Sequence, residues 1–119
     1  MLKDFNISSF KKMKPPSDNT FDTSQEIKAL KKIPLNKKFV KDYDNIEKAF
    51  AKTAEEQGVD YDKKIAAKLI TASAPIILKL KKHFDRPRPK ELAKKMNIKI
   101  KDIEMDSMKT ASYPSGHTA

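Results

Sequence analysis

Apolar residues recur at intervals of three and four along two stretches of the chain, and this spacing predicts two amphipathic helices. The first opens at Asn36 and stops at Gly58, because glycine is a common helix terminator. Its apolar positions share one face: Phe39, Tyr43, Ile46, Phe50 and Thr53. A stripe of this kind is typical of a helix face buried in a core, so we assign it no ligand.

The second predicted helix is longer and begins at a cap on Asp60. Pro75 lies in its interior and predicts a kink, because proline lacks the N–H that the helix needs. Lys81 falls at the border of the apolar face, where a lysine either reaches solvent or points into a pocket. The apolar face itself is formed by Ile65, Leu69, Ser73, Ile76, Leu80 and Phe84.

The remaining segments are shorter. Residues 1–22 are polar and read as an extended or disordered arm, followed by a helix from Thr23 or Ser24 to about Lys32. A short helix is expected over 90–95, whereas the alternating stretch 97–108 fits a strand, a loop or a helix equally well. Another helix is expected to begin at Pro114. The chain therefore reads as an arm over 1–22 and an all-α domain over 23–119.

Composition limits the size of that domain and the ligands that suit it. A chain of 119 residues is one domain at most, and 38% hydrophobic residues allow only a modest core. The formal charge of +10 suits anionic ligands, namely phosphate esters, nucleic acid or acidic membrane surfaces. Charge alone favours the simpler interpretation, an ordinary solvated basic surface.

Several site types and locations are disfavoured. The absence of cysteine excludes disulfides and thiolate metal sites, and two histidines are too few for a histidine-rich metal site. Residues 1–20 contain no apolar run of the length a secretory signal needs. The most apolar stretch, 65–80, is broken by Lys68, Pro75 and Lys79, whereas a membrane span needs about 20 apolar residues. We therefore expect a soluble protein, cytoplasmic by default.

Two short segments carry residues that suit phosphate chemistry. Six residues separate Lys81 from Arg88-Pro89, and the run Pro114-Ser115-Gly116-His117 follows after an interval of 24 residues. An arginine fork can hold two phosphoryl oxygens, while a lysine adds a compact charge. The glycine lets the backbone approach an anion closely, and the serine adds a hydroxyl donor. Histidine is the residue type best suited to proton transfer near neutrality.

This order and spacing resemble the first two of three signature blocks of the type 2 phosphatidic acid phosphatase/vanadium haloperoxidase superfamily. The run from Ser112 to Thr118 is most similar to that of soluble bacterial class A acid phosphatases. The resemblance covers residues 60–119 and implies a helical bundle truncated at its C-terminus. The third block, with an arginine, a nucleophilic histidine and an aspartate, is absent from these residues.

The resemblance assigns roles residue by residue. Lys81, Arg88, Ser115 and Gly116 would bind the phosphoryl oxygens, and His117 would protonate the leaving group. The reaction it implies is metal-independent phosphoric monoester hydrolysis through a phosphohistidine. The nucleophile would lie beyond the present C-terminus, so we expect a longer reading frame and little turnover of p-nitrophenyl phosphate by these 119 residues alone.

Alternatives remain at two levels. Lys79 precedes Arg86-Pro87 by the same six residues, so the Lys79/Arg86 register competes with Lys81/Arg88. We prefer the latter and expect Arg86 to be an auxiliary cation at the pocket mouth. The same set of residues could hold vanadate in a haloperoxidase, with vanadate as the only cofactor. A non-enzymatic basic protein that binds nucleic acid is less favoured, because no nucleic-acid-binding motif is present.

Overall fold

The computed structural model describes residues 2–103 and 105–118, with the side chains of Asp106 and Ser107 outside that description. Throughout the described residues the regular structure is helical and no strand occurs, as the all-α prediction requires. The elements are, in chain order, α1 (Ile7–Phe10), α2 (Phe21–Lys31), α3 (Lys37–Tyr43), α4 (Ile46–Gln57), α5 (Lys63–Phe84), α6 (Pro89–Lys95) and the 3₁₀ helix η1 (Asp106–Lys109).

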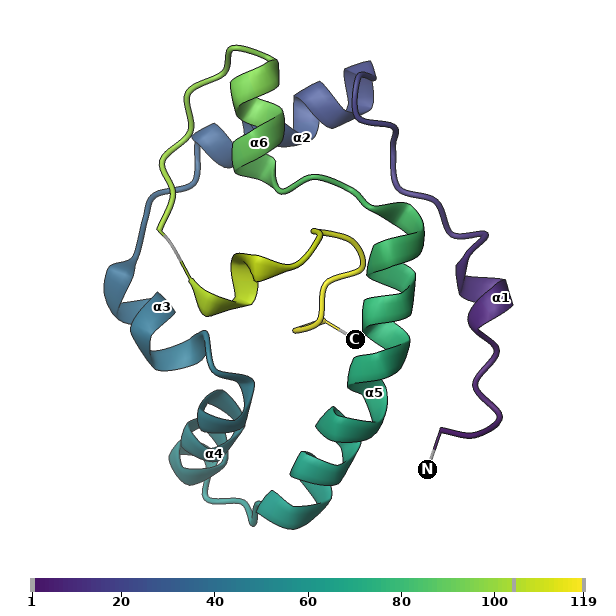
Figure 1. Cartoon of the computed structure of the whole chain (residues 1–119). Helices are drawn as coiled ribbons and strands as arrows, with labels where there is room; N and C mark the ends of the chain where they lie inside the picture. The colour runs from purple at the N-terminus through teal and green to yellow at the C-terminus, as the bar shows by residue number, and fades with distance from the viewer. Residues whose placement is uncertain (1, 104, 119) are drawn as a thin grey trace.

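The helices form an open ring, and the segment that contains η1 and the C-terminal residues crosses its middle (Figure 1). Neighbouring helices pack in the pairs α3 with α4, α4 with α5, α1 with α5, and α2 with α6. The molecule measures 46 × 37 × 20 Å, and its smallest dimension is only about two helix diameters of 10 Å each. Its radius of gyration of 16.4 Å exceeds the roughly 13.5 Å of a compact domain of this length, so the chain is less compact than a typical domain.

The core is small and lies between α2 and α6. Ile27 of α2 contacts Leu92 and Ala93 of α6, and all three are almost fully buried. Three half-buried residues from the chain after α6 pack against them: Met96, Ile98 and Ile100. Ile98 and Ile100 of the alternating stretch therefore pack against this core from a loop rather than from a strand.

The apolar stripe over 36–57 is not a core element in this structure. Phe39 and Phe50 are 58% and 55% exposed. The helix is also broken in two, because Asn45 adopts an extended conformation and its side chain accepts a hydrogen bond from the Lys48 backbone N–H at 3.1 Å. An asparagine in this role starts a new helix, so the predicted single helix becomes α3 and α4. The left-handed residue Gly58 ends α4, as predicted.

Helix α5 is the long helix that the second apolar pattern predicts, but it begins later than expected. Its cap is Asp62, whose side chain accepts from the N–H groups of Lys64 and Ile65, and not Asp60. The helix continues through Pro75, and its ribbon curves around the middle of the molecule (Figure 1).

Two terminal predictions need correction. The arm over 1–22 contains α1 and the beginning of α2, because Asn6 and Thr20 cap these helices with their side chains. The helix expected from Pro114 is replaced by bends and a turn over residues 112–118 as far as the structure describes them.

In the described part of the chain, no helix has the length and apolar character that crossing a membrane requires.

Candidate phosphate site

A cavity of about 240 Å³ lies where the end of α5, the start of α6 and the C-terminal segment meet. Its lining includes all five residues that the sequence predicts as the phosphate and acid groups. The seven lining residues are Ile46, Lys81, Arg88, Thr110, Ser115, Gly116 and His117. These residues are far apart in sequence, so only the folded chain brings them together.

The first cation, Lys81, belongs to the last turn of α5 and is only 6% exposed. Its ammonium donates a hydrogen bond to the backbone carbonyl of Ala111. Burial lowers the pKa of Lys81 below the ordinary 10.5, and the positive charge of Arg88 lowers it further. Since the group faces a cavity, an anion placed there would offset both effects.

The second cation, Arg88, is placed by the abrupt end of α5. Asp85 adopts a left-handed conformation (φ 46°) and ends the helix, while its N–H still donates to the Lys81 carbonyl at 2.7 Å. Arg88 is extended and caps α6, whose first residue is Pro89. Two flanking prolines restrict the backbone here, because each ring fixes φ and constrains the residue before it. The Arg88 Nε donates to the Thr110 carbonyl at 2.8 Å.

The C-terminal segment supplies the opposite wall through Ser115, Gly116 and His117. The Nε2 of His117 lies 2.6 Å from the backbone carbonyl of Asp44, at the C-terminal end of α3. The Oδ1 atom of Asp44 lies 4.0 Å from the same Nε2 atom. A carbonyl only accepts, so this contact requires the proton of His117 to be on Nε2.

Gly116 has open space where a side chain would begin. A Cβ atom built on this residue meets no other atom within 4 Å, and the backbone φ is not in the left-handed region. Neither protein packing nor backbone geometry therefore requires glycine at this position. A ligand that approaches the backbone closely would supply a reason.

Arg86 lies elsewhere, which corrects its assignment as an auxiliary cation at the cavity mouth. Its Nη2 atom donates to Glu26 Oε2 at 2.8 Å and to Thr23 Oγ1 at 3.3 Å, and both partners belong to α2. Lys79 is exposed on α5 and does not line the cavity. The cavity is thus lined by the Lys81/Arg88 pair and not by the competing Lys79/Arg86 pair.

Three contributors to this region were not among the predicted site residues. Ile46 had been placed on the apolar stripe, yet it lines the cavity. The carbonyls of Thr110 and Ala111 hold the two cations, but backbone groups leave no trace in residue identity. Asp44 was also missed, although an Asp-Asn pair before a new run of apolar residues is a recognisable capping signal.

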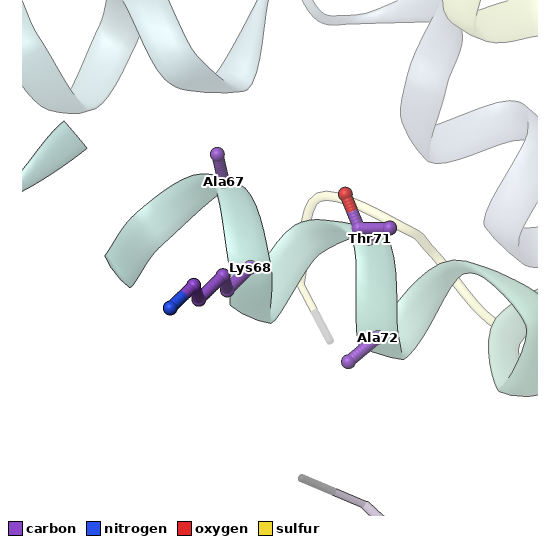
Figure 2. Close-up of a pocket in the computed structure, with 4 residues that line it drawn as sticks. All are labelled: Ala67, Lys68, Thr71 and Ala72. Atoms are coloured by element: carbon purple, nitrogen blue, oxygen red, sulfur yellow. The ribbon is translucent and has the colours of Figure 1, made fainter. Parts of the chain in front are cut away.

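The other groups with chemical potential lie outside this cavity. His83 is exposed and its ring packs edge-on against Phe84, 4.9 Å between centroids. Among the described residues, no cluster of three or more acidic or histidine side chains is placed to hold a metal ion. A shallow hollow of about 420 Å³ on α5 is lined by Ala67, Lys68, Thr71 and Ala72, and Figure 2 shows that these side chains all come from that one helix.

Comparisons with protein-family models, with curated proteins and with solved structures find no match to this chain.

Proposed function

We propose that this chain carries the phosphate-binding and general-acid part of a metal-independent phosphoric monoester hydrolase of the acid phosphatase/vanadium haloperoxidase type. The observation that supports it best is the shared cavity of Lys81, Arg88, Ser115, Gly116 and His117. Two cations, a hydroxyl, an unobstructed backbone and an imidazole are the groups that a phosphoryl anion and its leaving group require.

In the proposed reaction, Lys81 and Arg88 neutralise the charge that builds up on the phosphoryl oxygens. A histidine nitrogen attacks phosphorus as the ester P–O bond breaks, and His117 gives its proton to the departing alkoxide. His117 then takes a proton from water, whose oxygen attacks phosphorus as the P–N bond breaks, which releases phosphate and regenerates both histidines. The lining residues of the cavity include no second histidine, and the ring of His83 packs against Phe84 instead. We therefore propose that the nucleophile comes from chain outside these 119 residues.

Binding of inorganic phosphate tests the anion site without requiring turnover. Isothermal titration of the 119-residue chain should show saturable phosphate binding, with vanadate competing for the same site. Arg88→Ala should weaken binding by about 10- to 100-fold, because hydrogen bonds to charged groups contribute about 1.5–3 kcal/mol. Lys79→Ala is the matched control, since it also removes one positive charge from the same region but lies outside the cavity.

Equal weakening by both substitutions would indicate a diffuse electrostatic attraction and contradict the site. The nucleophile assignment is tested separately, because the chain by itself should hydrolyse p-nitrophenyl phosphate negligibly. Robust turnover that depends on His117 but on no added chain would overturn that assignment.

A further inference from the structure

Residues 110–112 make successive contacts with the segment that carries the two cations. Thr110 accepts from Arg88 through its carbonyl, and Ala111 accepts from Lys81 in the same way. The next residue, Ser112, contacts the backbone between the two cations. Its N–H donates to the Arg86 carbonyl at 2.9 Å, and its Oγ lies 2.9 Å from the Pro87 carbonyl and 3.2 Å from that of Arg86.

The cation-bearing segment depends on such outside donors. Pro87 and Pro89 have no N–H, so this stretch cannot stabilise itself with the repeating hydrogen bonds of a helix or a strand. The carbonyls of Arg86 and Pro87 precede Arg88 directly and both accept from Ser112. Ser112 is half-buried, so water does not freely replace its hydrogen bonds to these carbonyls.

The contacts also set the direction of each cation. An arginine has five N–H donors and a lysine ammonium has three. Binding one carbonyl through Nε fixes the plane of the Arg88 guanidinium, and the bond to Ala111 fixes the direction of the Lys81 ammonium. Moving the 110–112 segment would therefore move both cations relative to the cavity.

We infer that Ser112 is a positioning residue of the phosphate site. Its hydrogen bonds hold the 110–112 segment against the backbone of Arg86 and Pro87, and so keep Lys81 and Arg88 in place at the cavity. This inference rests on the proposed function, but it concerns a residue that does not line the cavity. Ser112 acts through the two cations and does not itself bind the anion.

The test exploits the composition of the chain, which has only two arginines, Arg86 and Arg88. An ¹H–¹⁵N spectrum of the Nε–H groups therefore contains two signals, which Arg86→Lys distinguishes. In the wild-type chain the Arg88 Nε–H should exchange slowly with water, because it donates to Thr110. Ser112→Ala should accelerate this exchange several-fold and weaken inorganic phosphate binding by about three- to tenfold, the effect of one neutral hydrogen bond.

Two further variants separate positioning from general stability. Ser112→Thr keeps the hydroxyl and should restore both the slow exchange and the phosphate affinity. Ser73→Ala is the control, because Ser73 is also half-buried but donates only within α5, to the Ile70 carbonyl at 3.0 Å. It should leave both readouts unchanged even if it lowers the melting temperature slightly.

The two hypotheses fail in different ways. If the wild-type chain binds phosphate through Arg88 but Ser112→Ala binds it equally well with unchanged Nε–H exchange, the positioning role is wrong and the proposed function stands. A Ser112→Thr variant as impaired as Ser112→Ala would also overturn the role, since the hydroxyl would not be the cause. If the wild-type chain binds no phosphate, the proposed function fails and this inference fails with it.

Discussion

Both ends of α5 contain apolar and charged residues, but they differ in how deeply those side chains are buried. At the C-terminal end, Leu80 and Lys81 are 5% and 6% exposed, and Lys81 donates to the carbonyl of Ala111 in the C-terminal segment. At the N-terminal end, Ile65 and Leu69 are 54% and 47% exposed, although they lie on the predicted core face. Periodicity therefore determines that a helix forms, whereas burial depends on which distant segment lies against it.

A related contrast separates the hydrogen bonds around the cavity from the aromatic contacts of α3 and α4. Around the cavity, bonds between residues 22 to 30 positions apart join the basic segment to the C-terminal segment. Arg86 adds a link from that region to α2. The aromatic contacts of α3 and α4 are local, such as Phe39 with Tyr43 and Phe50 with Tyr61. We expect the long-range contacts among the basic segment, the C-terminal segment and α2 to contribute most of the cooperative stability.

The largest expected effect is on the core beside the cavity. Leu92→Ala should lower the free energy of unfolding by about 2–5 kcal/mol, because Leu92 is 2% exposed and its truncation leaves a cavity against Ile27. Urea unfolding followed by circular dichroism measures the loss. A change below about 1 kcal/mol would contradict the idea that the α2–α6 contact is the stabilising core.

An intermediate effect is expected from pH. The pKa of Lys81 in the folded chain is below 10.5 because of burial and Arg88, so the unfolded chain binds more protons in the window between the two values. Stability should therefore rise with pH across that window, while phosphate binding, which needs the ammonium, should weaken. Lys81→Met should abolish both trends; unfolding and phosphate titrations at several alkaline pH values would show whether either persists.

The smallest effect is expected at the exposed end of α5. Leu69→Gln should change the free energy of unfolding by no more than about 0.5 kcal/mol, since almost half of the side chain already contacts water. Together with Leu92→Ala, this variant measures the contrast directly on two helical leucines. A loss comparable to that of Leu92→Ala would show that the two ends do not differ as described.

Sequence patterns predicted much of the helical architecture because caps and terminators act locally. Gly58 ends α4, and the short helix expected over 90–95 is α6 (Pro89–Lys95). The break at Asn45 was missed because the apolar spacing continues across it, and spacing alone does not reveal where a capping side chain interrupts a helix. The core role of Ile98 and Ile100 was equally hidden, since it depends on contact with α2 and α6.

The residue types around the cavity were evident from the chain itself: a lysine and an arginine at a fixed interval, and a short run of serine, glycine and histidine. Their assembly was not, because it depends on contacts between residues up to 73 positions apart, such as His117 with Asp44. The choice between the Lys81/Arg88 and Lys79/Arg86 registers also required the fold. Both pairs have the same spacing, and only the direction in which α5 ends places one pair at the cavity and turns Arg86 toward α2.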